Sequence, residues 1–329
     1  MVVDFPIDFV VTWVDDGDLA WRKEKNEYQS LDHDDKTETR FRDTGFFKYW
    51  FRAVNEYAPW VNHIYLVTNG QVPTFLNLEN DKITLVKHTE IMPSDALPTF
   101  NSNAIELSVR NIKGLSEHFV LFNDDMFLVK SVQPTDFFSA DGKAKDTAGL
   151  NEVMPVENFD HLIANNITII NQNFNKAEVL KKQWRLFFNW KNGPLNIYTA
   201  LLYFFPRFSR LYDLHVPYSL TKKNCSAFFN MAPSLHEKTV HSRFREITDI
   251  TIWGVRYYQI VSGEISPRKY NFGKFYTIND KDKVISEITN PKHYVIDIND
   301  ADTDNFEQIT SEITKAFGER LPQKSPYEK

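Results

Sequence analysis

Residues Phe119-Val120-Leu121-Phe122-Asn123-Asp124-Asp125 form an apolar run that stops at an amide and two adjacent carboxylates. A run of this length and type is typical of a buried strand. Ligands of open α/β sheets bind at the carboxyl ends of the strands, so these side chains are well placed to hold a cation. Carboxylate oxygens suit Mg²⁺ or Mn²⁺, and these ions suit phosphate. The sequence therefore predicts a site for a phosphorylated substrate at this strand end.

The two carboxylates can share one site only under a structural condition. Adjacent side chains on a regular strand point to opposite faces, so the strand must end in a turn before Asp124, which Asn123 favours. An Asn-Asp pair also often forms a turn or a helix N-cap without any functional role, and the dipeptide alone leaves the functional and the purely structural interpretation open. The acidic turn 15–18 reaches the same site only if the first and fourth strands are neighbours.

Three further strand-like runs alternate with helical patterns along the first half of the chain. Strands are predicted at 7–14, 62–68 and 83–86, and helices within 19–39, at 45–57, 103–112, 249–261 and 300–317. Such alternation predicts an α/β domain with a mainly parallel sheet. We expect 1–164 to form the α/β part that binds the substrate, 165–212 a helical insertion, and 213–329 a C-terminal part that completes the same catalytic domain.

The composition and the motifs that are absent argue against several classes of protein. The net charge of −6 argues against general nucleic-acid binding, and the single cysteine, Cys225, excludes an intrachain disulfide or a Cys-rich metal site. No Walker loop, Gly-x-Gly-x-x-Gly, Gly-x-Ser-x-Gly or His-Glu-x-x-His motif is present, so kinase, dinucleotide dehydrogenase, serine hydrolase and zincin functions have no support. The N-terminus lacks a basic leader and no run spans a membrane, so we expect a cytoplasmic protein.

The segment 181–210 allows two interpretations. It interleaves Lys and Arg with Trp, Phe and Tyr. An amphipathic helical hairpin packed on the core explains this pattern, and helices of that kind are common. A basic, aromatic surface that contacts a membrane or a lipid-linked substrate explains it as well. The aromatic content of 15% is in keeping with either interpretation.

Two arginine clusters and one histidine complete the candidates for chemistry. Arg40-Phe41-Arg42-Asp43 and Ser242-Arg243-Phe244-Arg245 each place two cations around an aromatic residue. Arginine side chains match phosphate oxygens in pairs, although such clusters are more often surface salt bridges. His215 is a natural general base near neutral pH, but eight other histidines compete with it.

At these residues the chain resembles the Stealth family in four blocks. Residues 7–15 resemble the first block. Residues 40–43, 57–60, 68–73, 97–106 and 122–125 resemble the second. His215-Val216-Pro217 through Arg245 resembles the third. Lys274 to Asp280, ending in Ile278-Asn279-Asp280, with the terminal Ser325-Pro326-Tyr327-Glu328, resembles the fourth. The blocks occur in order and cover most of the chain.

The resemblance implies a sugar-1-phosphate transferase of capsule or exopolysaccharide biosynthesis, on a Rossmann-like, glycosyltransferase-A-like fold. It implies a UDP-sugar donor, a glycan acceptor that is lipid-linked, release of UMP and a divalent cation, Mg²⁺ or Mn²⁺. Peripheral contact with the inner face of the membrane through 181–210 would fit such an acceptor. The catalytic roles it implies fall on Asp124, Asp125, His215 and Arg245, and the cation would be held by Asp124, Asp125 and Asp15. The residues expected to bind substrate are Trp13, Asp15, Arg40, Arg42, Asn69, Gln71, Asn101, Asn103, Asn123 and Arg243.

The chain departs from the family pattern at two places. Asp16-Gly17-Asp18 shifts the order that usually follows the first block, and Thr44-Gly45-Phe46-Phe47 is apolar where the second block usually continues with Asn and acidic residues. Two alternatives remain open at this point. One is a conventional glycosyltransferase that releases UDP, and the other is a carbohydrate-binding protein without catalysis.

Overall fold

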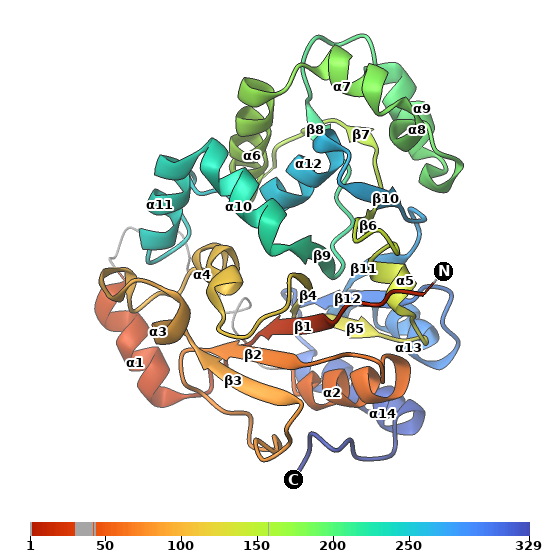
Figure 1. Cartoon of the computed structure of the whole chain (residues 1–329). Helices are drawn as coiled ribbons and strands as arrows, with labels where there is room; N and C mark the ends of the chain where they lie inside the picture. Colours follow the sequence, from red (N-terminus) through yellow and green to blue (C-terminus); the bar gives the residue numbers. More distant parts are fainter. Residues whose placement is uncertain (1, 30–41, 43, 157) are drawn as a thin grey trace.

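The computed structural model describes residues 2–29, 42, 44–156 and 158–329, and its centre is a five-stranded sheet in the order β3-β2-β1-β4-β9 (Figure 1). The strands are β1 (Ile7–Thr12), β2 (Ile64–Thr68), β3 (Ile83–Lys87), β4 (His118–Asn123) and β9 (Tyr218–Thr221). The first four are parallel, and β9 pairs antiparallel with β4 at one edge. The predicted α/β domain with a mainly parallel sheet is confirmed, with all four predicted strands.

A second sheet, which the sequence did not predict, continues from the first. It has the order β11-β12-β5, where β5 (Met126–Leu128) is antiparallel to β12 (Val295–Asn299) and β11 (Gly273–Thr277) is parallel to β12. Only Asp124 and Asp125 separate β4 from β5, so these two residues lie where the two sheets meet. Two smaller pairs are β6 (Ala144–Asp146) with β10 (Ile265–Pro267), and β7 (Leu150–Asn151) with β8 (Arg210–Leu211).

Helices cover the sheets and form the upper part of the molecule in Figure 1. The α-helices are α1 (Leu19–Tyr28), α2 (Phe47–Tyr57), α3 (His88–Ile91), α4 (Ser102–Ser108), α5 (Pro134–Phe137), α6 (Phe159–Asn173), α7 (Lys176–Lys182), α8 (Trp184–Phe187), α9 (Leu195–Leu202), α10 (Lys222–Met231), α11 (Pro233–His241), α12 (Trp253–Ser262), α13 (Lys281–Thr289) and α14 (Phe306–Arg320). Short 3₁₀ helices are η2 (Ser94–Ala96), η3 (Val109–Asn111), η4 (Trp190–Asn192) and η5 (Ile278–Asp280). None of the described helices is long and apolar enough to cross a bilayer.

Local sequence signals explain several helix boundaries. Asp18 is the N-cap of α1, because its carboxylate accepts hydrogen bonds from the backbone N–H groups of Ala20 and Trp21. Gly263 ends α12 in a left-handed conformation with φ of +80°, and a Cβ there would lie 2.2 Å from the amide nitrogen of Gln183. Glycine adopts this φ without strain, whereas a larger residue would be strained and would displace the end of the Gln183 side chain.

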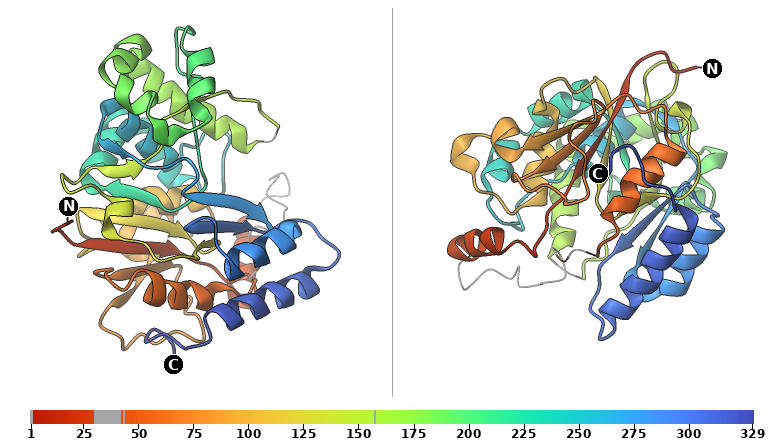
Figure 2. Two further views of the ribbon diagram at one scale, coloured as in Figure 1. Left: turned by 90° about the vertical axis from the view of Figure 1, so that its right-hand side faces the viewer. Right: turned by 90° about the horizontal axis from the view of Figure 1, so that it is seen from below.

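The aromatic excess fills the core beneath the central sheet. Phe9 on β1 and Phe122 on β4 pack with ring centroids 4.7 Å apart, and Trp50 of α2 meets Phe122 edge to face at 5.4 Å. From the C-terminal helix α14, Phe317 packs against Phe127 of β5 at 5.1 Å. The core is therefore continuous between the two sheets, and Figure 2 shows α13 and α14 side by side against the C-terminal strands.

The predicted helical region 165–212 contains α7 to α9 and most of α6, which begins earlier, at Phe159, and packs against α12. This region lies at the end of the molecule opposite the C-terminus (Figures 1 and 2). The division of the chain at 164 and 212 into three parts stays a prediction.

Candidate active site

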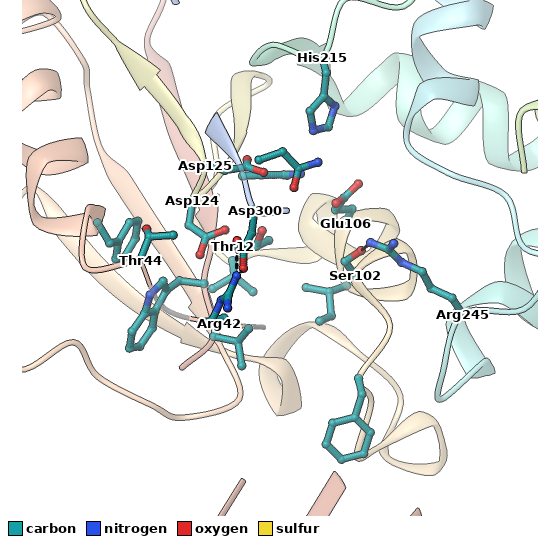
Figure 3. Close-up of a pocket in the computed structure, with 18 of the residues that line it drawn as sticks. Thr12, Arg42, Thr44, Ser102, Glu106, Asp124, Asp125, His215, Arg245 and Asp300 are labelled. Atoms are coloured by element: carbon teal, nitrogen blue, oxygen red, sulfur yellow. Dashed lines mark hydrogen bonds and ion pairs between the residues drawn. The ribbon is translucent and has the colours of Figure 1, made fainter. Parts of the chain in front are cut away.

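A pocket of about 610 Å³ lies at the carboxyl ends of β1, β2, β4 and β12 (Figure 3). This volume is typical of sites for small molecules. The predicted site residues that line the pocket are Trp13, Arg42, Asn69, Asn123, Asp124, Asp125, His215 and Arg245. Arg40 lies outside the described residues. Phe275, from the fourth block, also lines the pocket, so the fold brings together side chains from all four sequence blocks.

The turn between β4 and β5 carries the two predicted carboxylates. β4 ends at Asn123 and β5 begins at Met126, so Asp124 and Asp125 are released from strand alternation and both line the pocket. The backbone carbonyl of Asp125 accepts a hydrogen bond of 2.9 Å from the amide of Ile298 in β12. The predicted turn is confirmed, and the neighbouring sheet fixes its geometry.

A cluster of Asp125, His215 and Asp297 is the strongest candidate for a metal site in the described part of the chain. Each offers one ligand atom, and these atoms all lie within 4.8 Å of one another. Asp297 is fully buried, and neither of its carboxylate oxygens has a hydrogen-bond donor; one oxygen of Asp125 also lacks one. Buried acceptors without donors are costly and fit the coordination of a cation. The set therefore fits a divalent metal ion.

The electrostatics of the cluster point the same way. Burial raises the pKa of Asp125 to about 6. Burial and the adjacent charge of Asp125 raise the pKa of Asp297 well above its ordinary value. Two carboxylates this close resist ionising together unless a positive charge lies between them. A bound cation would supply that charge.

His215 is held in a fixed orientation beside these carboxylates. Its Nδ1 lies 2.9 Å from the Tyr218 hydroxyl, and that hydroxyl accepts a hydrogen bond of 2.6 Å from Nε1 of Trp253. Its Nε2 lies 3.4 Å from a carboxylate oxygen of Asp297. Burial and the charges of Arg245 and Arg256 lower the pKa of His215 to about 4, so the ring is neutral at neutral pH. A neutral imidazole can bind a metal or accept a proton.

Glu106 and Ser102 face the pocket from α4, beside Arg245 (Figure 3). Arg245 donates a hydrogen bond of 2.6 Å to the Ser102 hydroxyl. Burial raises the pKa of Glu106 to about 7; the charge of Arg245 lowers it in part, and that of Asp125 raises it further. A carboxyl group with this pKa can exchange a proton near neutral pH. Glu106 is therefore a second candidate base, which the sequence did not single out.

Arg42 enters the pocket from the opposite side and is held by Asp300. Its guanidinium makes two hydrogen bonds to the Asp300 carboxylate, of 2.8 and 2.7 Å. The same group lies 3.6 Å above the ring of Phe306. These contacts orient the guanidinium group of Arg42 toward the pocket, while Asp300 offsets part of the positive charge of that group.

Two predicted binding residues do not line the pocket and instead position those that do. Asn101 is fully buried, and its amide donates to the carbonyls of Ser242 and Phe244 and to the carboxylate of Asp249, at 3.0, 3.2 and 2.8 Å. Arg243 donates to the carbonyl of Pro98 at 2.8 Å. These bonds fasten the start of α4 to the loop that carries Arg245.

Three more predicted residues also lie outside the pocket lining. Asp15, expected among the metal ligands, turns its carboxylate to the amide of Gly17 at 2.7 Å and is not part of the acidic cluster. The side chain of Gln71 holds the loop after β1: it accepts a hydrogen bond of 3.0 Å from the backbone N–H of Asp15 and donates one of 2.8 Å to the backbone carbonyl of Asp15. Asn103 is buried in α4. β1 and β4 are neighbours as the sequence argument required, yet Asp15 points elsewhere.

The tripeptide Ile-Asn-Asp occurs twice, and the structure places the second copy in the pocket. The first copy, Ile278-Asn279-Asp280, ends the stretch that resembles the fourth block. Its Asp280 caps η5 and pairs with Lys283 at 2.7 Å. Ile298-Asn299-Asp300 follows β12 and lines the pocket, directly after Asp297. The parallel register pairs Thr277 with Asn299, so the two copies end neighbouring strands. The repeated tripeptide was the available signal for Asp297 and Asp300.

Comparisons with known proteins agree with the resemblance to the Stealth family. The family models for Stealth protein conserved regions 1 and 2 match residues 5–30 and 40–146. The chain is 49% identical over 327 residues to the exopolysaccharide phosphotransferase cps2G of Lactiplantibacillus plantarum, covering 99% of this chain and 97% of that one. It is 40% identical over 329 residues to the capsular polysaccharide phosphotransferase WcwK of Streptococcus pneumoniae, covering 98% of each chain.

Among solved structures, galactosyltransferase LgtC in complex with donor and acceptor sugar analogs covers 97% of this chain and 98% of that chain, with a TM-score of 0.43 and 10% identity. This likeness is too weak to support an argument. The curated relatives match over nearly their full length, and they are transferases by name, so the expectation of an enzyme holds over that of a binding protein. The chain belongs to the Stealth family of exopolysaccharide and capsular polysaccharide phosphotransferases.

Proposed function

We propose that the enzyme transfers a sugar-1-phosphate from a UDP-sugar to a hydroxyl group of a glycan acceptor, forming a phosphodiester and releasing UMP. The observation that carries the proposal is the cluster of Asp125, His215 and the fully buried Asp297. Asp125 and His215 line one pocket with Arg42 and Arg245. Phosphoryl transfer needs little covalent chemistry from a protein, so positioning and charge neutralisation dominate. A pocket with a cation site between two arginines supports that requirement.

The proposed cation is held by Asp125 and Asp297, with Nε2 of His215 as third ligand. Carboxylates suit both Mg²⁺ and Mn²⁺, whereas an imidazole nitrogen is a poor ligand for Mg²⁺, so we favour Mn²⁺ of the two. When bound, such an ion neutralises charge on phosphate oxygens. Asp124 faces the same pocket and is left for the sugar or the nucleotide.

The two arginines supply the remaining positive charge. Arg245 and Arg42 line opposite parts of the pocket, where their guanidinium groups can meet phosphate oxygens. The acceptor hydroxyl attacks the β-phosphorus and UMP leaves, while the bond between C1 and oxygen stays intact. The anomeric configuration of the donor is therefore retained.

Two groups compete for the role of general base. His215 is neutral and within the pocket, but its Nε2 faces Asp297 and the proposed cation. Glu106 has a pKa of about 7 and is not one of the proposed metal ligands. A general base typically contributes about 10²–10⁴ in rate. Because we propose His215 as a metal ligand, we propose that Glu106 takes the proton of the acceptor hydroxyl.

The nucleotide that is released tests the reaction. The enzyme is incubated with a panel of UDP-sugars, Mn²⁺ or Mg²⁺ and a bacterial membrane fraction as the source of acceptor, and the products are separated. We expect UMP and a phosphodiester ³¹P signal in the glycan. Release of UDP would overturn the proposal in favour of a conventional glycosyltransferase.

We further propose that the acceptor is lipid-linked and that the enzyme works at the inner face of the membrane.

A further inference from the structure

One end of the molecule exposes an unusual number of large apolar side chains. In the part of the chain that the structure describes, eighteen such side chains are exposed, and nine of them lie between residues 184 and 205. Phe204 is 87% exposed and Trp190 is 72% exposed. We call these nine residues the aromatic surface: Trp184, Phe188, Trp190, Ile197, Tyr198, Leu201, Tyr203, Phe204 and Phe205. Exposed apolar patches of this kind mark interaction sites.

The aromatic surface lies on α8, η4 and α9, at the end of the molecule far from the C-terminus (Figures 1 and 2). The rings of Phe188 and Tyr203 have centroids 6.3 Å apart, and those of Tyr203 and Phe204 are 5.5 Å apart. These contacts join the end of α8 to the end of α9. Phe188, Tyr203 and Phe204 therefore form one continuous group of rings within the aromatic surface.

A buried cation holds the most exposed part of the patch in place. Lys176 is 3% exposed, and its ammonium donates hydrogen bonds to the carbonyls of Leu202 and Phe205, the latter at 2.8 Å. Burial of a lysine is costly unless its charge is satisfied. The turn that presents Tyr203, Phe204 and Phe205 is therefore a fixed structure rather than a loose loop.

The charge around the patch is opposite to that of the rest of the protein. Residues 181–210 contain six Lys or Arg and no Asp or Glu, whereas the chain as a whole has a net charge of −6. The remaining residues therefore carry −12. Lys181, Lys182, Arg185 and Arg207 are all exposed. Positive charge is concentrated on the same segment that exposes the rings.

We propose that the aromatic surface binds the surface of an anionic lipid bilayer, with its rings among the headgroups and its cations on the lipid charges. Trp, Tyr and Phe favour the membrane–water interface, and basic residues are attracted to anionic lipids. A second copy of the chain fits less well, because it would bring four exposed cations against four others. Binding needs no turnover, so its outcome is independent of the proposed reaction.

Cosedimentation with vesicles tests the proposal. The full chain is mixed with vesicles of phosphatidylcholine alone or with a third of phosphatidylglycerol, at low and high salt. We expect binding to the anionic vesicles only, weakening as salt rises because exposed charges are screened. The variant Lys181→Gln/Lys182→Gln/Arg185→Gln should bind roughly 100-fold more weakly, since each cation contributes about a factor of five.

A second set of variants tests the rings. Trp190→Ser/Phe204→Ser/Phe205→Ser should weaken binding at least about tenfold. The matched control Val2→Ser/Leu19→Ser/Val156→Ser removes three equally exposed apolar side chains outside the patch and should bind as the wild type does. Phe204→Ser alone carries the test if the triple variant does not fold. Absence of wild-type binding at low salt, unchanged binding of the ring variants, or a dimer that the ring variants dissolve would each overturn the proposal.

Discussion

The replacement Asp297→Asn tests the proposed metal site without changing the shape of the side chain. Asp297 is fully buried, its two carboxylate oxygens lack donors, and Asp125 lies beside it. Asparagine removes one negative charge and can donate a hydrogen bond to Asp125. Two effects of opposite sign are expected. Without metal the variant should be more stable than the wild type, and with metal it should gain little or nothing.

The size of the first effect follows from the cost of ionising a buried carboxyl group. The pKa of Asp125 rises from 3.8 to about 6. A shift of about two units, each worth about 1.4 kcal/mol, corresponds to roughly 3 kcal/mol lost at pH 7. The pKa of Asp297 is raised well above its ordinary value, so removing its carboxylate should also stabilise the metal-free protein at pH 7. A carboxyl group with a raised pKa costs nothing below its unfolded pKa, so the gain should vanish near pH 4.

The size of the second effect follows from binding linkage. A ligand at 100 times its dissociation constant stabilises the folded state by about 2.7 kcal/mol. In a chain of this length we expect the wild-type melting temperature to rise by roughly 5 °C on adding Mn²⁺. Asp297→Asn leaves the cation with one carboxylate and one imidazole, and the rise should be mostly lost.

Thermal melts in EDTA and in Mn²⁺, at pH 4.5 and pH 7, measure both effects. The control is Asp280→Asn. Asp280 follows the neighbouring strand β11 as part of the first Ile-Asn-Asp tripeptide, but it pairs with Lys283 and lies outside the pocket. The control should keep the full response to metal. A wild-type response in Asp297→Asn, or a metal-free variant that melts lower than the wild type at pH 7, would refute the assignment of Asp297 as a ligand.

Three further predictions concern the residues around the cluster. If Glu106 is the base, activity should rise with pH through about 7, because the carboxylate form is needed, and Glu106→Gln should remove that limb of the pH–rate profile; a limb that persists assigns the base elsewhere. Arg42→Lys should raise KM for the donor about tenfold or more while leaving thermal stability nearly unchanged, because a lysine cannot hold both oxygens of Asp300; an unchanged KM would exclude Arg42 from donor binding. Asn101→Ala should lower the free energy of unfolding in urea by about 1–3 kcal/mol, since it removes the amide donor of two carbonyls and one of the donors to the buried carboxylate of Asp249, which keeps the amide of Glu246; a loss below about 0.5 kcal/mol would contradict this role.

The central sheet was predictable because its strands are apolar on both faces. Ile7–Thr12 and His118–Asn123 are runs that a buried parallel strand requires, and turn residues mark their ends. β12 escaped prediction because Asp297 lies in its middle, and a carboxylate within Val295–Asn299 reads as a break in a strand. Asp297 is also the residue that we propose as a metal ligand, and functional sites are where local rules are expected to fail.

The side chains that line the pocket were harder to predict than the blocks that contain them. Asn101 and Arg243 belong to segments that resemble family blocks, yet the structure uses them to hold the loop of Arg245. Polarity and spacing cannot separate a residue that contacts substrate from one that positions it. Only the direction of the side chain does so, and tertiary packing determines that direction.

The proposed metal site lies where the two sheets join. Asp125 belongs to the turn after β4, and Asp297 belongs to β12, which pairs with β5 immediately after that turn. The backbone bond between Ile298 and Asp125 fixes this junction, and the clamp of Arg42 on Asp300 fixes its far side. A cation between Asp125 and Asp297 would join the first sheet to the second, since each sheet supplies one carboxylate. The repulsion between the carboxylates, which costs stability in the metal-free protein, then becomes affinity for the ion.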